Sequence, residues 1–313
     1  MSKQLPVVGL ADITAVATRS LVLDAVRCAL VAHAEGATVL PPPAHLDFPA
    51  GDCHVKTGYV KGMPHFAVKV ATGFPGRGLP ANDGLLLVID ASTGRPVAAL
   101  ADEGWLTAWR TAAAGALVTH ALTPAGVTQV GVLGTGPQAR LQVEWLRELR
   151  PVTQVVVWGR RPAAAAEVCA DLRAAGVAAE PGAAERAASQ PCVIAATPAT
   201  APLAPASRFA LAKHITAIGT DMPGKNELPP ELFAQATLIA TDDHDQCLDH
   251  GDFGNAVRAG EVAADADVPV GTVLGCTPRK RLGRDVLSIA DLTGIGAADA
   301  AVASAVTTAL WAA

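Results

Sequence analysis

The sequence is poor in aromatic residues, which make up 4% of its 313 positions, and it has no closely spaced cysteine pair. Its six cysteines are scattered, so we expect buried free thiols and neither a zinc site nor a disulfide framework. Charge, glycine or proline interrupts every apolar run before about 18 residues, so no membrane-spanning helix is expected. A basic start followed by an apolar segment is also missing, so no signal peptide is evident and we expect a cytoplasmic protein.

An excess of positive charge is absent too. The formal net charge of −5 gives no reason to expect nucleic acid or an anionic membrane as a partner. The short basic run at residues 279–281 is expected to be a solvated loop. Half of the residues are hydrophobic, and a chain of this length can form two domains with cores of their own.

The chain before residue 122 has the pattern of a helix followed by antiparallel strands. Helical spacing over residues 21–34 predicts a helix with Cys28 on its apolar side. Proline and glycine then separate extended segments at 38–40, 53–60, 65–72, 85–89 and 97–101. A long helix is expected over 105–121. No alternation of strand and helix occurs in this part of the chain.

After residue 128 the pattern changes to strands that alternate with helical or connecting segments. The expected strands are 130–133, 154–158, 192–196, 215–218 and 237–240. Such alternation is typical of a parallel, doubly wound sheet with right-handed crossovers. After Gly251 the pattern is helical again, and an alanine-rich helix over 297–311 is expected to close the chain and to pack on the N-terminal part.

The stretch from Val130 to Ala139 joins a strand to a helix through a glycine turn. Gly134, Gly136 and Ala139 occupy the G-x-G-x-x-G/A positions of a dinucleotide-binding unit. Gly134 permits the sharp turn and Gly136 lets the backbone approach a pyrophosphate at the helix N-terminus. An ordinary glycine-containing turn is the alternative. The residues assigned to cofactor binding here are Gly134, Thr135, Gly136, Pro137, Gln138 and Ala139.

The residues after the next strand bear on the choice of nucleotide. They are Trp158, Gly159, Arg160 and Arg161. An acidic residue there would accept hydrogen bonds from a ribose 2′-hydroxyl and select NAD, whereas two guanidiniums can hold a 2′-phosphate, so NADP is favoured over NAD. The alternative is that one or both arginines point to water. The cofactor-binding set is completed by residues that follow later strands: Thr197, Gly219 and Thr220.

The sequence therefore predicts an α/β protein. A Rossmann-type doubly wound parallel sheet is expected at residues 123–289. A discontinuous α+β domain is expected at residues 1–122 and 290–313.

Several motifs follow one another along the chain. They are FAVKVATGF at 66–74, LLVIDASTGRP at 86–96, LTAWRTAAA at 106–114, the Gly134 turn with Gln138, and GTDMPGKNEL at 219–228. With them the sequence resembles the ornithine cyclodeaminase/mu-crystallin family over most of its length. The resemblance implies a homodimer whose α+β domain binds substrate and pairs the subunits, and redox chemistry at the α-carbon of a small amino or imino acid.

The resemblance also implies roles for three residues. Lys69 and Arg110 match cations that hold the substrate carboxylate, and Asp221 matches a carboxylate that meets the reacting amine. We therefore predict Asp221 and Lys69 as catalytic residues. The structural alternatives are a lysine that extends to solvent, an interdomain ion pair for Arg110, and a turn cap for Asp221.

The chain departs from the family pattern at one carboxylate-binding position. Members often have Pro-Pro-Arg where this chain has proline at Pro43, so a guanidinium is missing. Lys56 and His45 lie close in sequence and are candidates to compensate. Lys56 is equally compatible with a solvated strand face, and His45 is more simply a loop histidine than a catalyst.

A second group of polar residues resembles a metal site on paper. The residues are Asp242, Asp243, His244 and Asp245. Because acidic residues are favoured at a helix N-terminus, a carboxylate-rich helix start is the more ordinary interpretation, and we expect no metal.

The lead hypothesis from the sequence is an NAD(P)-dependent enzyme that resembles ornithine cyclodeaminase and converts L-ornithine to L-proline and ammonia. The alternatives are an NADPH-dependent ketimine or cyclic-imine reductase and an alanine dehydrogenase. A nicotinamide-dependent small-molecule binding protein with little turnover is a further alternative.

Overall fold

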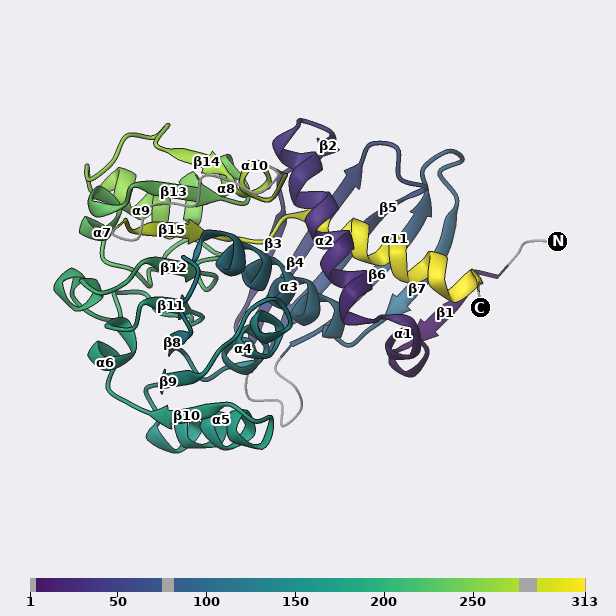
Figure 1. Ribbon diagram of the computed structural model, residues 1–313. Coiled ribbons are helices and arrows are strands. Elements are labelled where there is room, and N and C mark those ends of the chain that lie inside the picture. Colours follow the sequence, from purple (N-terminus) through teal and green to yellow (C-terminus); the bar gives the residue numbers. More distant parts are fainter. Residues whose placement is uncertain (1–3, 75–81, 276–285, 313) are drawn as a thin grey trace. The chain divides into compact units, whose positions relative to one another are not determined.

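A computed structural model of the protein describes residues 4–74, 82–275 and 286–312 (Figure 1). The chain divides into two compact units, Met1–Ala113 with Ile295–Ala313 and Ala114–Gly294. We describe each unit by itself. Within the described ranges, none of the helices has both the length and the apolar character that crossing a membrane requires.

The first unit contains a mixed seven-stranded sheet in the order β1-β7-β6-β5-β4-β2, with β3 also paired to β4. Strand β1 pairs with β7 in parallel, and the other neighbours are antiparallel. The strands are β1 (Val7–Gly9), β2 (Thr38–Val39), β3 (Ala44–Phe48), β4 (Gly51–Val60), β5 (His65–Gly73), β6 (Asn82–Asp90) and β7 (Pro96–Ala101).

Three helices of the first unit are α1 (Leu10–Val16), α2 (Arg19–Ala34) and the closing helix α11 (Gly296–Ala312). Helix α11 packs on α2 and on strands β4 and β5, so the C-terminal segment belongs to this unit. The Thr18 hydroxyl accepts a hydrogen bond from the Leu21 N–H and so caps α2. The prediction for Cys28 was wrong, because the face of α2 that includes Val22 and Val26 is buried and Cys28 is exposed.

Helix α11 approaches strand β4 at a contact between two glycines. A Cβ atom added to Gly58 would lie 2.3 Å from the carbonyl carbon of Gly296, and a Cβ on Gly296 would lie 2.3 Å from the Thr57 oxygen. Both obstacles are backbone atoms, so a rotamer change cannot relieve either clash. Glycine at these two positions therefore permits the helix to lie against the sheet.

We expect Gly58→Ala to lower the free energy of unfolding by about 3 kcal/mol, since the methyl group must push two backbone segments apart. The measurement is urea denaturation followed by circular dichroism. Gly9→Ala is a matched control, because a Cβ there meets nothing within 4 Å and the backbone is extended. Equal stability of the two variants would contradict the close packing of α11 on β4.

The second unit is built on an eight-stranded sheet in which every pairing is parallel. The order is β10-β9-β8-β11-β12-β15-β13-β14. All residues of several strands are buried, as expected for strands covered on both faces. The strands are β8 (Gln129–Leu133), β9 (Gln154–Trp158), β10 (Ala178–Pro181), β11 (Cys192–Ala195), β12 (His214–Ala217), β13 (Leu238–Thr241), β14 (Asp267–Pro269) and β15 (Ser288–Asp291).

Helix α3 (Trp105–Leu122) contains the boundary between the two units. The remaining helices belong to the second unit: α4 (Pro137–Leu149), α5 (Pro162–Ala174), α6 (Ala184–Ala188), the 3-10 turn η1 (Ala206–Phe209), α7 (Glu231–Gln235), α8 (His244–His250), α9 (Asp252–Arg258) and α10 (Val270–Gly275). The chain therefore has the expected α/β fold, with a doubly wound parallel sheet in one unit and a mixed sheet in the other. This fold confirms the prediction of fold class.

The main difference from the predicted elements is strand β15, which lies in a region where we expected only helices. This four-residue strand inserts between β12 and β13, although it follows both of them in the chain. A strand that short carries no periodicity by which to distinguish it. The strands β1, β3, β10 and β14, of three to five residues each, were not predicted either.

The cysteines of the described residues are free thiols. Cys169, Cys192 and Cys247 are buried as expected, Cys53 is half-buried and Cys28 is exposed. Cys276 and the basic run at 279–281 lie outside the described residues.

Candidate functional site

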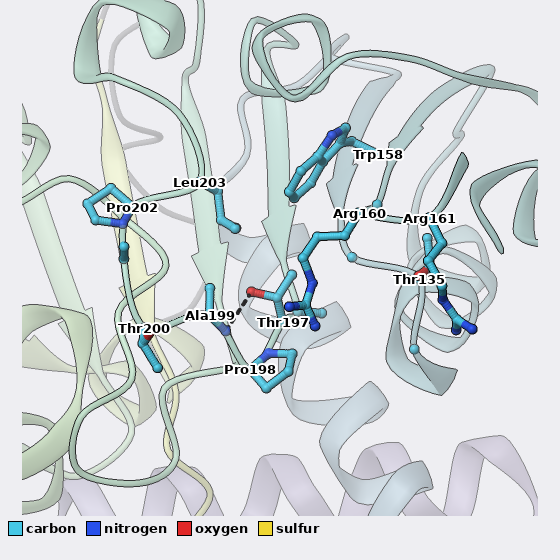
Figure 2. Close-up of a pocket in the computed structure, with 15 residues that line it drawn as sticks. Thr135, Trp158, Arg160, Arg161, Thr197, Pro198, Ala199, Thr200, Pro202 and Leu203 are labelled. Carbon is cyan, nitrogen blue, oxygen red and sulfur yellow. Dashed lines mark hydrogen bonds between the residues drawn. The ribbon is translucent and has the colours of Figure 1, made fainter. Parts of the chain in front are cut away.

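A cavity of about 680 Å³ lies at the carboxyl ends of strands β8, β9 and β11 (Figure 2). Strand β8 lies between the other two in the sheet, and the chain proceeds to β9 on one side and to β11 on the other. This is the point where the strand order reverses, and ligands of open α/β sheets bind at such a point. The volume is within the range of small-molecule and cofactor pockets.

The glycine turn forms one wall of this cavity. Gly134 has φ +136°, and a Cβ there would lie 2.4 Å from the Ala196 carbonyl oxygen, so only glycine fits. Gly136 is the N-cap of the 13-residue helix α4, with Pro137 as the first helical residue. A Cβ on Gly136 would meet nothing within 4 Å. The first N–H groups of α4 thus begin at the wall of the cavity, an arrangement that suits a pyrophosphate.

Arg160 and Arg161 line the same cavity and are exposed. Figure 2 shows the Arg160 side chain extending toward Thr197 and Pro198, whereas Arg161 extends in a different direction. The Arg161 backbone is the N-cap of α5, and Pro162 follows as the first helical residue. Arg160 is therefore the better placed of the two to meet a ligand group in the cavity.

The structure brings eight of the thirteen predicted cofactor residues to this cavity, namely Gly134, Thr135, Gly136, Trp158, Gly159, Arg160, Arg161 and Thr197. The other five, Pro137, Gln138, Ala139, Gly219 and Thr220, do not line it. Ala139 is buried where α4 packs, and Gln138 accepts a hydrogen bond from Gln142. The sequence analysis missed the segment from Pro198 to Leu203, which follows β11 and also lines the cavity.

In the first unit, Lys69 and Arg110 meet at a single carboxylate. Lys69 Nζ lies 2.8 Å from Asp299 Oδ2, and Arg110 Nε lies 2.9 Å from Asp299 Oδ1. The three residues come from β5, α3 and α11, and each is at most 7% exposed. The sequence analysis missed Asp299. It is the one charged residue in the sequence of α11, and a lone acid in an alanine-rich helix was the available signal.

Burial decides the protonation of Lys69. Desolvation lowers its pKa to about 7, the charge of Asp299 opposes this change, and the charges of Arg110 and Lys56 add to it. Burial by itself raises the pKa of Asp299, but the charges of Arg110 and Lys69 outweigh burial, so that this pKa lies below its ordinary value. Asp299 is therefore ionised at neutral pH, and Lys69 is close to its midpoint.

Lys56 lies directly opposite Lys69 in the β4–β5 pairing and is 8% exposed. Lys56 is thus part of the buried charge cluster, and its position is not that of a solvated strand face. The charges of Lys56, Lys69 and Arg110 all act on the Asp299 carboxylate, and the buried Asp102 also interacts with Lys69. Basic side chains predominate in this cluster, which favours the binding of an anion.

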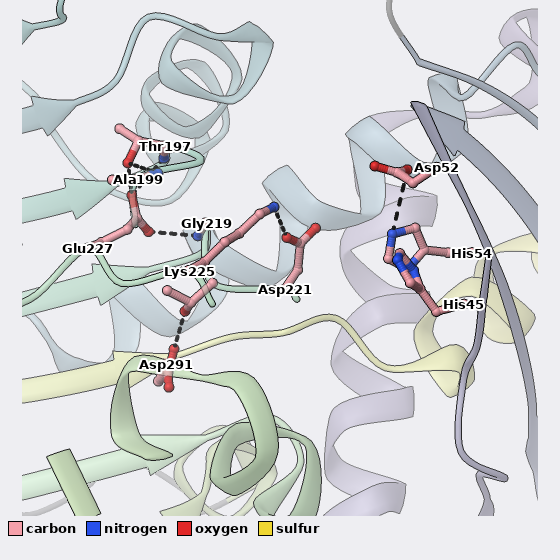
Figure 3. Close-up of polar contacts among 11 residues, drawn as sticks. His45, Asp52, His54, Thr197, Ala199, Gly219, Asp221, Lys225, Glu227 and Asp291 are labelled. Atoms are coloured by element: carbon pink, nitrogen blue, oxygen red, sulfur yellow. Dashed lines mark hydrogen bonds and ion pairs between the residues drawn. The ribbon is translucent and has the colours of Figure 1, made fainter. Parts of the chain in front are cut away.

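His45 lies in strand β3 and not in the loop that we expected. Its Nδ1 atom is 3.4 Å from Nδ1 of His54, the residue opposite it on β4 (Figure 3). Nε2 of His45 lies 2.9 Å from Asp47 Oδ1, and Nε2 of His54 lies 3.7 Å from Asp52 Oδ1. Because side chains alternate along a strand, His54 and Lys56 share one face of β4. Pro43 directly precedes β3, so the histidine pair lies close in the sheet to the position where the guanidinium is missing.

Asp221 belongs to the second unit and lies in the loop after β12, at the carboxyl edge of the parallel sheet. Its side chain is about half exposed and forms an ion pair with Lys225 (Figure 3). Gly224, with φ +85°, turns the chain between these two residues.

A network of buried carboxylates holds this loop by hydrogen bonds. It was not predicted from the sequence. Glu227 accepts hydrogen bonds from the Thr197 N–H at 2.6 Å, the Thr197 hydroxyl at 2.8 Å and the Gly219 N–H at 2.7 Å (Figure 3). Asp252 accepts bonds from the N–H groups of Glu227 and Leu228.

Asp291, at the end of β15, completes the network. It accepts bonds from the Thr220 hydroxyl and the Phe253 N–H. Burial raises the pKa of Glu227 to about 7 and that of Asp252 to about 8, and it raises the pKa of Asp291 well above its ordinary value. Three acids so close together do not all ionise at neutral pH, so they hold protons among them.

Asp243 and Asp245 lie at the start of a helix, as predicted, whereas Asp242 has a different role. The Asp243 side chain caps α8 by accepting the Gln246 N–H. Asp242 accepts bonds from the backbone N–H groups of Thr293 and Gly294. The described residues contain no group of three or more histidine, cysteine, aspartate or glutamate side chains that could hold a metal ion.

Comparisons with known proteins agree with this architecture. The family model for the ornithine cyclodeaminase/mu-crystallin family matches residues 7–310. An uncharacterized cyclodeaminase of Sinorhizobium fredii is 35% identical over 90% of this chain and 89% of its own length.

Two solved structures are similar over nearly their whole length. An archaeal alanine dehydrogenase dimer with bound NAD has a TM-score of 0.91 at 27% identity, over 98% of this chain and 96% of that one. The iminosuccinate reductase of Paracoccus denitrificans in complex with NAD+ has a TM-score of 0.87 at 27% identity, over 99% and 97%. The chain belongs to the ornithine cyclodeaminase/mu-crystallin family.

Proposed function

We propose that the protein is an NAD(P)-dependent oxidoreductase that interconverts a small 2-imino acid and the corresponding amino acid. The observation that carries this proposal is the buried cluster in which Lys56, Lys69 and Arg110 surround the carboxylate of Asp299. A substrate carboxylate is the anion that this cluster favours. The glycine-turn cavity in the second unit supplies the residues for the cofactor.

The side chains of the cluster have different roles in binding the substrate carboxylate. A guanidinium can bind a carboxylate bidentately, and Arg110 also forms an ion pair with Asp299 through Nε. Lys69 adds a compact charge. Asp299 holds both cations in place and keeps Lys69 partly protonated at neutral pH.

A nicotinamide dinucleotide, when bound, supplies hydride for the substrate α-carbon. The glycine turn and the start of α4 would hold its pyrophosphate, and Arg160 would meet the adenosine ribose. In the direction of reduction, Asp221 would deliver a proton to the substrate nitrogen, and in the opposite direction its carboxylate would accept that proton. The balance is one imino acid, one reduced cofactor and one proton for one amino acid and one oxidised cofactor.

Net redox fits the charges of the first unit better than cyclodeamination does. A diamino acid brings a second ammonium group, and basic side chains already predominate in the buried cluster. Both solved relatives at 27% identity are named for net redox reactions. Cyclodeamination is the second candidate, favoured by the 35% identical relative that is named a cyclodeaminase.

The deciding experiment follows the absorbance of the reduced cofactor. Purified protein with NADPH or NADH is mixed with pyrroline-2-carboxylate, piperideine-2-carboxylate, or a 2-oxo acid and ammonia. We expect steady oxidation of the cofactor, and Asp221→Asn is expected to slow it by about 10³-fold. Ammonia release from L-ornithine with catalytic NAD+ and no net reduction would instead establish the cyclodeaminase. Tight nucleotide binding without turnover in either assay would leave a binding protein.

Arg160 provides a test of cofactor choice. We expect Arg160→Ala to weaken NADPH binding by about 10- to 100-fold, since a hydrogen bond to a charged group contributes about 1.5–3 kcal/mol, and to leave NADH binding nearly unchanged. Fluorescence titration measures both dissociation constants. Arg161→Ala is the matched control, with a smaller loss because that side chain extends elsewhere. Equal losses for NADPH and NADH in Arg160→Ala would contradict an NADP preference.

We also propose a homodimer formed through the first unit, whose sheet exposes the apolar side chains of Val39, Leu46, Phe48 and Leu85. The archaeal alanine dehydrogenase is a dimer. Light scattering after size exclusion should give twice the chain mass, and Phe48→Glu should shift the protein toward monomer. A monomeric wild-type protein would refute the proposal.

A further inference from the structure

We propose that Glu227 is a positioning residue that couples the cofactor cavity to the loop bearing Asp221, and this inference rests on the proposed function. One carboxylate contacts both segments. Its Oε1 atom accepts the Thr197 N–H and hydroxyl, and Thr197 lines the cavity. Its Oε2 atom accepts the Gly219 N–H, two residues before Asp221. A ligand that orders the segment after β11 therefore acts on the Asp221 loop through a single rigid group.

The packing around Glu227 leaves little room for another arrangement. Glu227 is fully buried, and a Cβ added to Gly219 would lie 2.1 Å from the Thr197 carbonyl oxygen and 2.5 Å from Glu227 Oε2. The two segments thus touch directly beside the carboxylate. The Glu227 backbone is itself held, since its N–H donates to Asp252 at 2.9 Å and its carbonyl accepts the Leu203 N–H at 2.9 Å. Leu203 also lines the cavity, so the backbone provides a second link to it.

The groups around the Glu227 side chain require it to accept hydrogen bonds with both oxygens. All three donors around its carboxylate are N–H or O–H groups, which match a carboxylate with two acceptor oxygens. Asp291 holds the same loop through the Thr220 hydroxyl at 3.2 Å. Oδ2 of Asp252 is buried and has no hydrogen-bond partner among the described residues. Hydrogen bonds therefore hold the loop at Gly219 and Thr220, the two residues that precede Asp221.

Glu227→Gln tests this role with little change in volume. The amide nitrogen must replace one oxygen and will face a donor, so one of the two segments loses its acceptor. We expect amide exchange at Gly219 or Thr197 to rise at least about 10-fold, and kcat to fall at least about 10-fold while the substrate KM changes less than about threefold. Glu231→Gln, an exposed glutamate at the start of α7, is the matched control and should change none of these.

The coupling itself is measured by hydrogen exchange with and without NADPH. NADPH should slow exchange of the Gly219 amide in the wild-type protein and in Glu231→Gln, but not in Glu227→Gln. Equal protection in all three, or none in the wild-type protein, would overturn the proposal. So would a fall in thermal stability without any change in kcat or in protection, because that result indicates a purely structural role.

Glu227→Asp covers the case in which the glutamine variant does not fold. The shorter side chain keeps the charge but cannot reach both segments, so kcat and protection should again fall, and retention of both would overturn the proposal. These readouts also separate the inference from the proposed function. If no imino acid is turned over, the proposed function fails, whereas NADPH-dependent exchange still decides the role of Glu227.

Discussion

Lys69→Met is expected to lower kcat/KM for the imino acid by about 10³-fold, because removing one partner of a buried charge contact costs about 2–5 kcal/mol. Methionine keeps most of the volume of the lysine stem, so the loss reports the charge. Arg110 and Lys56 would then remain to hold the substrate carboxylate. Steady-state kinetics at saturating NADPH measure the effect.

Stability should not follow activity in this variant. Lys69 is 3% exposed and its charge is desolvated, while Asp299 retains its contact with Arg110 at 2.9 Å. We therefore expect the free energy of unfolding to stay the same or to rise. Lys61→Met is the control, because the Lys61 side chain is exposed and donates to the Gly36 carbonyl. A kcat/KM for Lys69→Met within about threefold of wild type would refute the substrate role of Lys69.

Asp299→Asn is expected to move the pH dependence of kcat/KM to lower pH. Desolvation lowers the pKa of Lys69 to about 7 against the opposing charge of Asp299. The wild-type protein should therefore lose kcat/KM as the pH rises through about 7, where Lys69 loses its proton. Without Asp299 the pKa of Lys69 falls further, so the decline begins at lower pH. A pH–rate profile of both proteins measures this change, and superimposable profiles would contradict it.

The pKa shifts of Lys69 and Asp299 also predict how the free energy of unfolding changes with pH. The pKa of Lys69 is lowered from 10.5 to about 7, so between these values the unfolded chain binds more protons and Lys69 makes the free energy of unfolding rise with pH. The pKa of Asp299 lies below 3.8, so its ion pairs stabilise the protein above that value and are lost as pH falls through the lowered pKa. Asp299→Asn removes this contribution and should cost about 3 kcal/mol at neutral pH. The cost should be smaller at pH 9, because Lys69 is then neutral, and a cost independent of pH would contradict the assignment.

Much of the fold could be predicted because its signals are local. Strand β9 was predicted with its observed ends, and α3 to within one residue, because each has an uninterrupted pattern bounded by turn residues. The glycine turn was equally readable, since the left-handed φ of Gly134 requires glycine at that position. The placement of β15 was not readable, because strand order depends on the whole sheet and not on four residues.

The candidate site divides in the same way. The resemblance of its motifs to the family identified Lys69, Arg110 and Asp221 as candidates. They did not identify Asp299, which reaches Lys69 and Arg110 only when α11 lies across the sheet of the first unit. In the sequence, Glu227 is likewise a single acid in a loop. Only the folded chain places it against α9 and against the segments that follow β11 and β12.

By itself, the sequence determined the α/β class, the glycine turn and the cationic strand and helix positions, because each depends on the neighbours of a residue along the chain. Only the tertiary structure decided which charges are buried together, which acid holds Lys69 and Arg110, and which carboxylate joins the segments after β11 and β12. The physical reason is that burial and charge pairing depend on distance in space, and residues such as Lys69 and Asp299 become neighbours only when the chain folds.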